Sequence, residues 1–414
     1  MIARAAVPVM ALALLAGLIL AGIDLGHRYR ASTRRTATVA SAVAQFEAPK
    51  SATTSEQLDA IVVGSGIAGL SAAYELGRGG ARVVIVDMAS VFGGHAVMAT
   101  GDLCLIDTPF QRARGIRDSA ELAYQDFMRW GEDANPQWVR YYVDHSREQV
   151  YEWLTSLGIA FEKLILPAGN SVERTHRTLG RGIGLVSPIF VEVARMPNVS
   201  FRWNTQVERL LSKQGRVVGV GTKHVRSEAR GELRASVVVL ATGGFQSNLD
   251  RVRAAWSADL PLPKRLLIGS GIHSLGSGLD LAQGAGADLI HLDRQWNYIT
   301  GLPDPRYPGA ERGVHAVNPD SVWVDATGKR FIAERSSTKF GLPVLVRLPG
   351  STYWSIFDQA SKRSFWMAGS DWSSFDTIEK MIFSNPELVK TADTLPELAR
   401  SSGLPVAQLE RTIA

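Results

Sequence analysis

The sequence predicts an α/β protein built around a doubly wound parallel sheet. Residues 60–63 are an apolar run and residues 81–87 read ARVVIVD, and both have the composition of strands; the segment between them enters a helix through a glycine-rich loop. A strand, a loop, a helix and a strand within about 30 residues form the repeating unit of such sheets. A third apolar run, at 235–240, predicts another strand that returns to the same sheet.

The loop at residues 64–69 has the glycine spacing of a dinucleotide-binding turn. Gly64 permits the tight turn, Gly66 allows the backbone to approach a pyrophosphate, and Gly69 allows close packing of the helix on the sheet. The helix offers unpaired N–H groups and the positive end of its dipole to phosphates. Asp87 ends the second strand, where its carboxylate can accept hydrogen bonds from ribose hydroxyls. This loop alone is compatible with both FAD and NAD.

Two further glycine clusters favour a flavin. Residues 91–102 contain a Gly-Gly pair, which suits a loop that passes against a flat ring, where side chains would collide. The apolar strand at 235–240 ends in a second cluster at 241–244. Between the two clusters, residues 198–223 predict a strand and then an antiparallel hairpin.

The first 35 residues predict a membrane anchor or a signal segment. The 19 residues from Ala5 to Ile23 carry no charge, and as a helix they would rise about 28 Å, close to the hydrocarbon thickness of a bilayer. The alternative is a signal peptide cleaved near residues 40–42, which would give a periplasmic or secreted protein. Arginines are more numerous after the apolar run than before it, which favours an anchored chain with a cytoplasmic body. Residues 36–56, rich in Ala, Ser and Thr, predict a flexible linker.

Charge and cysteine content exclude some classes of function. The net charge is +5, and residues 1–50 contribute +4 of it, so the rest of the chain is close to neutral. That balance argues against a nucleic-acid-binding protein. Cys104 is the only cysteine, which excludes an intrachain disulfide, and its apolar neighbours predict an inert core thiol. No spacing of His and Cys residues predicts a metal site.

From residue 58 to residue 414 the chain resembles a family of FAD-dependent oxidoreductases. The family includes succinate dehydrogenase and fumarate reductase flavoproteins, soluble fumarate reductases and ketosteroid dehydrogenases. The resemblance depends on motifs in the family's order, among them GSGIAGLSAA, GGHAVMATGD, VVVLATGGFQSN, GSGLDLAQGAGADL and SVWVDATGKRFIAE. It implies an FAD-binding domain over 57–295 and an α+β capping domain over 296–414 that closes over a small-molecule substrate. It also implies hydride transfer between the flavin and a carbon of a C–C single or double bond, and it allows for an electron-transfer partner.

The resemblance assigns FAD binding to the glycine clusters and to several positions near them. The implied positions are Gly64, Ser65, Gly66, Ala68, Gly69, Asp87, Gly93, Gly94, His95, Thr100, Gly101, Val207, Ala241, Thr242, Gly243 and Ser277, the last in place of a flavin-side acid. His95 aligns with the histidine that bonds covalently to the flavin in membrane-bound relatives, whereas soluble relatives have Asn or Ser there. Covalent attachment, a noncovalent flavin contact and an unrelated loop histidine all remain open for it.

Three side chains are candidates for catalysis. His176 and Arg177 would contact an anionic substrate or the flavin, and the alternative is a loop with solvated charges. Arg335 follows the GKRFIAE motif and is a candidate for a relocated proton donor. Its alternative is a surface ion pair with Glu334 or Asp325.

The sequence departs from the family at the substrate site. Thr338 stands where soluble fumarate reductases have an arginine acid, and Val314 and Val317 stand where they have Glu and Arg. The charges that bind a dicarboxylate are absent, so fumarate and succinate are disfavoured as substrates. Trp296 and Tyr298 lie in a segment that lacks the family's histidine, and we interpret them as aromatic residues of the cap interface.

The family's C-terminal segment has no counterpart before Ala414. In the family this segment returns to the FAD domain with a final strand and further substrate ligands. Both domains are therefore expected to be incomplete, with an open strand edge. The leading hypothesis is a membrane-anchored FAD-dependent oxidoreductase that acts on a C–C bond. The alternatives are a non-catalytic flavoprotein fragment and an NAD-dependent dehydrogenase, which the later glycine clusters disfavour.

Overall fold

A computed structural model describes residues 58–334 and 336–414, and residues Gln57–Ala414 form one compact unit. The predicted membrane anchor and linker, at 1–35 and 36–56, lie outside the described residues. Within the described part, no helix has both the length and the apolar character that crossing a bilayer requires.

The largest sheet has the strand order β6-β2-β1-β9-β8-β7. Its strands are β1 (Leu58–Val63), β2 (Val83–Val86), β6 (Val199–Arg202), β7 (Thr205–Lys213), β8 (Arg216–His224) and β9 (Arg230–Leu240). β6, β2, β1 and the second half of β9 run parallel. All four residues of β2 are β-branched and buried, as expected for a parallel strand that is covered on both faces. The predicted α/β fold is confirmed.

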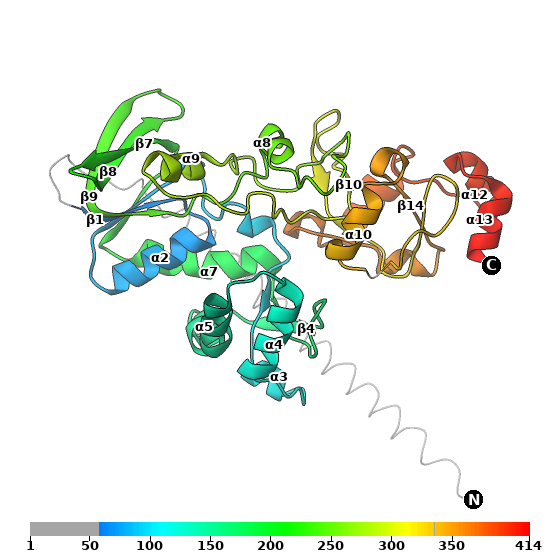
Figure 1. Cartoon of the computed structure of the whole chain (residues 1–414), viewed down its shortest axis with the longest axis horizontal. Coiled ribbons are helices and arrows are strands. Elements are labelled where there is room, and N and C mark those ends of the chain that lie inside the picture. Colours follow the sequence, from blue (N-terminus) through cyan, green and yellow to red (C-terminus); the bar gives the residue numbers. More distant parts are fainter. Residues whose placement is uncertain (1–57, 335) are drawn as a thin grey trace, which may run out of the picture. The chain divides into compact units, whose positions relative to one another are not determined.

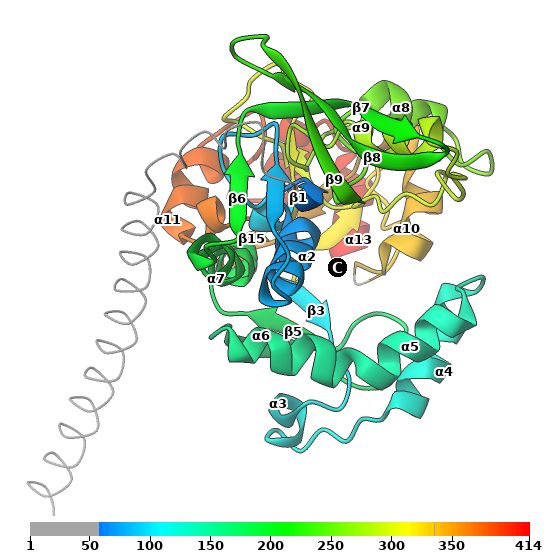
Figure 2. The same cartoon turned by 90° about the vertical axis from the view of Figure 1, so that its left-hand side faces the viewer.

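The two faces of this sheet are covered by different kinds of structure (Figures 1 and 2). Helices α2 (Ile67–Arg78) and α7 (Arg181–Arg195) pack on one face and against each other. β7, β8 and the first half of β9 form an antiparallel meander that covers the other face, where Val207 and Val220 pack near Ile61. The prediction of a doubly wound sheet is therefore corrected, because the apolar side of the hairpin takes the place of a second helical layer.

A smaller antiparallel sheet with attached helices is inserted between β2 and α7. Its strands, in the order β3-β5-β4, are β3 (Asp102–Cys104), β5 (Thr175–Thr178) and β4 (Phe161–Ile165). The attached helices are α3 (Pro109–Arg112), α4 (Ala120–Gly131), α5 (Pro136–Ser146), the π-helix η2 (Arg147–Glu152) and α6 (Trp153–Ser156). Burial raises the pKa of the Cys104 thiol to about 11, which is consistent with the inert thiol that the sequence predicts.

A buried ion-pair network holds this insertion together. Arg174 donates hydrogen bonds to Asp118 and Asp126, and the three side chains are at most 1% exposed. Asp126 also accepts hydrogen bonds from the backbone N–H and the hydroxyl of Ser171, at 2.8 and 2.7 Å. Burial alone would raise the pKa of Asp126, but the hydrogen bonds from Arg174 and Ser171 outweigh burial and lower it.

Residues from 302 onward form small antiparallel sheets and short helices. The strand pairs are β10 (Leu302–Pro303) with β11 (Gly313–Val314), β12 (Ala316–Val317) with β15 (Trp366–Met367), and β13 (Val322–Val324) with β14 (Trp354–Ile356). The helices include α10 (Thr338–Leu345), α11 (Phe375–Ile378), α12 (Leu395–Ser402) and α13 (Val406–Ile413). One buried apolar cluster contains Met367 and Trp372, and another contains Leu404 and Leu409. The mixture of helices and strands agrees with an α+β cap, while the boundary between 295 and 296 stays a prediction.

We expect Arg174→Met to destabilise the protein strongly. The substitution leaves two buried carboxylates without their cation, and breaking a buried pair in this way costs about 3–5 kcal/mol. The free energy of unfolding, measured by urea titration with tryptophan fluorescence, is the readout. Arg195→Met is the matched control, because Arg195 is 63% exposed and pairs with Glu192 on the surface, where a pair contributes at most about 1 kcal/mol.

The same network predicts how this loss depends on pH. The folded-state pKa of Asp126 is lowered, so the stabilisation is complete above the ordinary pKa of aspartate and is lost as the pH falls through the lowered value. The difference in unfolding free energy between wild type and Arg174→Met should therefore shrink as the pH is lowered from about 6 to about 3. A difference that stays constant over this range would contradict the assignment.

Candidate functional site

Three glycine bends that are far apart in the sequence meet at the carboxyl ends of β1, β2 and β9. A Cβ on Gly64 would lie 2.4 Å from the carbonyl oxygen of Ala241, so the first and third bends touch. Gly66 and Gly93 form a parallel bridge, and the N–H of Gly93 donates to the carbonyl of Ser65 at 2.9 Å. Ligands of open α/β sheets bind at this edge. The three clusters singled out in the sequence thus surround one place.

The first and third bends leave open space where a phosphate would approach. Gly66 precedes the 12-residue helix α2, and a Cβ built on Gly66 meets no atom within 4 Å. Gly243 also faces open space. Gly69, in contrast, is tightly packed, since a Cβ there would lie 1.9 Å from the carbonyl oxygen of Gly64. This cradle, with the unpaired N–H groups at the start of α2, fits the pyrophosphate of a dinucleotide such as FAD.

Asp87 holds the backbone of the first bend in place. Its Oδ2 atom accepts hydrogen bonds from the backbone N–H and the hydroxyl of Ser65, both at 2.6 Å. Its Oδ1 atom accepts a hydrogen bond from the N–H of Ala89 at 2.8 Å. The sequence predicts that Asp87 and Ser65 contact the cofactor directly. In the structure the hydrogen bonds between them also fix the shape of the first glycine bend.

The remaining positions implied for the cofactor lie in different environments. Ala68 is exposed on the first turn of α2, and Val207 is buried in the sheet core. Thr242 lies against α9 (Ser277–Gly284), where a Cβ on Gly278 would be 1.8 Å from its Oγ1 atom. Ser277 is the first residue of that helix.

The implied positions in the second glycine cluster lie at the edge of the site. Gly94 lies close to Gly66, and Gly101 lies close to Thr178 and Arg181. His95 and Thr100 line the cavity described next.

A large cavity begins directly beside the second and third bends. Its volume is about 2290 Å³, and its lining includes His95, residues 97–100, Gly244 and much of 291–402. Pockets for one small molecule are typically about 300–1,000 Å³, so this cavity has room for more than one ligand. The side chain of His95 is exposed toward the cavity, and partial desolvation by the surrounding protein lowers the pKa of its imidazole.

His176 does not line this cavity. It is fully buried in β5, with Nδ1 at 2.6 Å from the carbonyl oxygen of Arg174, so Nδ1 carries the proton and donates. Nε2 then accepts from the hydroxyl of Thr108 at 2.7 Å. Burial lowers the pKa of His176 to about 4. Both ring nitrogens are engaged within the protein, which differs from both interpretations of the sequence, a contact with substrate or flavin and a loop with solvated charges.

Arg177 is also engaged by a partner within the insertion. Its Nε and Nη2 atoms donate to the two carboxylate oxygens of Asp102, both at 2.8 Å, and these hydrogen bonds raise the pKa of the guanidinium. This bidentate ion pair joins β3 to β5. Arg335, the third candidate for catalysis, lies outside the described residues.

Two further residues near the site were not among the candidates selected from the sequence. Arg181, at the start of α7, donates to the carbonyl oxygens of Met367 and Gly369 at 3.0 and 3.1 Å. His315 lines the cavity, and burial lowers the pKa of its imidazole to about 4. The glycine motif around Arg181 is the one local pattern that could have identified Arg181 from the sequence. No local pattern indicates His315, because both residues reach the site through contacts with segments that are distant in the sequence.

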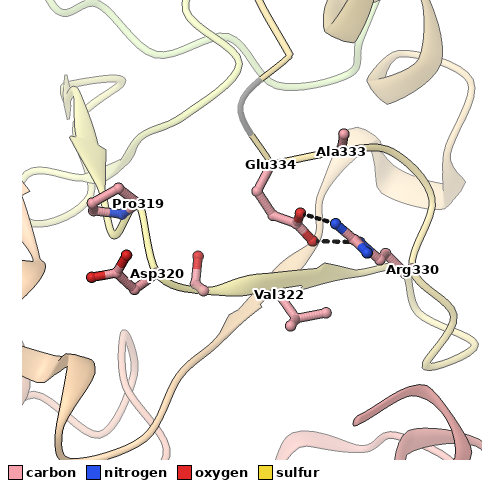
Figure 3. A pocket seen from close by; sticks show the side chains of 7 residues that line it. Pro319, Asp320, Val322, Arg330, Ala333 and Glu334 are labelled. Atoms are coloured by element: carbon pink, nitrogen blue, oxygen red, sulfur yellow. Dashed lines mark hydrogen bonds and ion pairs between the residues drawn. The ribbon is translucent and has the colours of Figure 1, made fainter.

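A smaller hollow of about 380 Å³ lies beside β13 and shares no lining residue with the large cavity (Figure 3). Arg330 and Glu334, both from the GKRFIAE motif, form an ion pair beside it, with Nε and Oε1 separated by 2.8 Å. Glu334 also accepts a hydrogen bond from the backbone N–H of Trp323 at 3.0 Å. The side chain of Glu334 is only 9% exposed. These contacts fix the fold of the β13 segment.

Comparison with known proteins gives matches to flavoproteins. The family model described as "FAD binding domain" matches residues 59–341, which is more than half of the chain. A KsdD-like steroid dehydrogenase of Mycobacterium tuberculosis is 39% identical over 308 residues, covering 66% of this chain and 54% of the relative. A fumarate reductase (cytochrome) of Shewanella frigidimarina is 31% identical over 365 residues, covering 87% of this chain and 60% of the relative.

A solved structure with the same fold is that of a flavocytochrome c3 fumarate reductase in its open conformation. The TM-score is 0.66 at 25% identity, and the match covers 91% of this chain and 63% of that one. The chain therefore spans little more than half the length of the curated relatives that it matches. We conclude that it belongs to the FAD-binding flavoprotein family that includes fumarate reductases and steroid dehydrogenases.

Proposed function

We propose that the protein is an FAD-dependent oxidoreductase that acts on a C–C bond of a small organic substrate. The meeting of three glycine bends beside a large cavity carries this proposal. FAD, when bound, supplies hydride acceptance or donation at a C–C bond. The relatives named above are a steroid dehydrogenase and a fumarate reductase, whose names describe an oxidation and a reduction of small organic molecules, which supports the proposal.

The task of this chain's own residues is to bind and to position. The start of α2 and the open side of Gly66 and Gly243 receive the pyrophosphate, while Asp87 keeps the first bend in shape. The cavity that opens beside His95 receives the substrate and limits its contact with water. We give His176 a structural role in this proposal, because both of its nitrogens have partners inside the protein.

Location and partners are also part of the proposal. The uncharged run from Ala5 to Ile23 supports a membrane anchor, and the arginines that follow it support a cytoplasmic body. An electron-transfer partner would restore the flavin after each turnover.

Gly66→Ala tests the cofactor site separately from the fold. The new methyl group meets no protein atom within 4 Å, so it causes no clash, and the poorer N-cap of α2 should cost about 0.5–1 kcal/mol of stability. The methyl group would occupy the space through which the pyrophosphate approaches, so FAD affinity should fall by about tenfold or more. Quenching of flavin fluorescence measures the affinity, and urea titration measures the stability.

Gly284→Ala is the matched control for this variant. It adds the same methyl group at the end of α9, also without an atom within 4 Å. FAD affinity should be unchanged. If wild type and Gly66→Ala bind FAD with equal affinity, the pyrophosphate does not bind next to Gly66.

Anaerobic mixing of the FAD-loaded chain with candidate substrates tests the reaction. With an oxidisable substrate, the flavin absorbance should bleach while the substrate loses two hydrogens, one as hydride to the flavin and one as a proton. Absorbance and mass spectrometry of the same sample measure both changes. Bound FAD that dithionite reduces, but that exchanges no hydrogen with steroids, succinate or fumarate, would argue for cofactor binding without this activity.

A further inference from the structure

Arg181 begins α7 with a backbone conformation that residues with a side chain seldom adopt. Its φ is 57°, directly after Gly180 with a φ of 80°. This left-handed conformation is unfavourable for an L-residue and persists where the surroundings enforce it, most often at functional sites. Here the hydroxyl of Thr178 lies between the carbonyl oxygens of Gly101 and Arg181, at 3.0 and 2.8 Å. The surroundings thus hold Arg181 in a strained form that fixes the direction in which its side chain leaves the backbone.

The same turn is attached to the second glycine bend. The N–H of Gly182 donates to the carbonyl oxygen of Ala99 at 3.1 Å, and the N–H of Thr178 donates to the carbonyl oxygen of Gly101 at 3.0 Å. The backbone on either side of Arg181 is therefore fixed to the bend that lies beside the flavin in the proposed function.

The side chain of Arg181 crosses to a distant part of the chain. Its Nη1 atom donates to the carbonyl oxygens of both Met367 and Gly369, at 3.0 and 3.1 Å. Hydrogen bonds from a guanidinium are charge-assisted, and they are stronger than those from a neutral donor. Desolvation, followed by repulsion from Arg177, lowers the pKa of Arg181, but an arginine keeps its charge in proteins. The two carbonyl groups therefore stabilise a half-buried positive charge.

These carbonyl groups belong to one wall of the large cavity, the strand-pair wall, which we define as residues 315–317 and 366–369. Within it, β15 pairs with β12, and the N–H of Ala368 donates to the carbonyl oxygen of His315 at 2.9 Å. These contacts join the two segments into one unit. The members of the wall that line the cavity are His315, Ala316, Val317, Ala368 and Gly369.

We propose that Arg181 is a positioning residue that sets the place of the strand-pair wall relative to the second glycine bend. One nitrogen atom links the wall to a backbone that the bend itself holds. The importance of this link for catalysis rests on the proposed function, in which the bend lies beside the flavin and the wall borders the substrate. Hydride transfer needs reacting atoms about 3–3.5 Å apart, so a displacement of the wall by about 1 Å would slow it.

A role limited to the stability of the fold would have a different signature. The strand-pair wall has an apolar core of its own, in which Met367 packs with Val314 and Trp372. The wall can therefore stay folded when the link to Arg181 is lost. Loss of the link should free the wall locally, while the main sheet keeps its protection from solvent.

Hydrogen–deuterium exchange of the full chain, with and without added FAD, tests the proposal in the variant Arg181→Met. Methionine keeps an unbranched stem but has no donor. Residues 366–369, including the N–H of Ala368, should exchange about tenfold faster than in wild type, because two charge-assisted hydrogen bonds are lost. Peptides from β1 and β2 should exchange at the wild-type rate. Mass spectrometry of proteolytic fragments measures both regions in the same sample.

Two further variants serve as controls. Both hydrogen bonds come from the single atom Nη1, and an ammonium group also carries its donors on one nitrogen, so Arg181→Lys should restore slow exchange of 366–369. Arg195→Met removes an arginine at the other end of α7 that is 63% exposed and pairs with Glu192. It should leave the exchange of the wall unchanged.

Three results would overturn the proposal. The first is unchanged exchange of 366–369 in Arg181→Met. The second is faster exchange spread equally over β1, β2 and the wall, because that pattern reports a loss of global stability. The third is an Arg181→Lys variant that exchanges as fast as Arg181→Met.

FAD uptake, measured by flavin fluorescence in the same preparations, separates this proposal from the proposed function. A wild-type chain that takes up no FAD would contradict the oxidoreductase, while local freeing of the wall in Arg181→Met would still support the positioning role. A chain that takes up FAD, but whose wall does not respond to the loss of Arg181, would contradict the positioning role alone.

Discussion

The close approach of the Gly64 backbone to the carbonyl group of Ala241 is the contact on which the candidate site depends. No side chain fits there, since a Cβ would stand 2.4 Å from the Ala241 oxygen. The same constraint recurs where Gly69 packs against Gly64. Because these contacts are between backbones, the bends keep their places without long side chains that would fill the cradle. The space needed for a cofactor is thus a direct result of how the strand ends pack.

The parts that were predicted well from the sequence are those determined by local patterns. β1, the glycine loop, α2 and β2 follow one another within residues 58–86, and their apolar and glycine spacing is sufficient to identify them. The covering of the second sheet face was predicted incorrectly. It depends on how Val207 and Val220 of the hairpin meet the face that carries Ile61, and a sequence pattern does not specify which surfaces will meet.

The catalytic candidates show the same limit at the level of single residues. A histidine next to an arginine in a polar segment has the composition of a binding site, yet His176 is buried and Arg177 pairs with Asp102, which lies 75 residues away in the chain. The pairing of Arg177 with Asp102 cannot be inferred from spacing. The GKRFIAE motif behaves similarly, because its Arg330 and Glu334 stabilise the segment around β13. In this protein many of the charged groups near the site are used to hold segments together.

That use of charge has a consequence for recognition. Arg306 and Lys362 border the cavity but are already neutralised, so bringing an anion to them would require breaking an existing pair. An uncharged apolar ligand needs no such exchange, because its affinity comes from apolar area removed from water, at about 25 cal/mol per Å². Trp296 and Tyr298 are exposed aromatic residues in the lining of the cavity that His95 and Thr100 also line. Val314 and Val317 line the same cavity and add no charge to it.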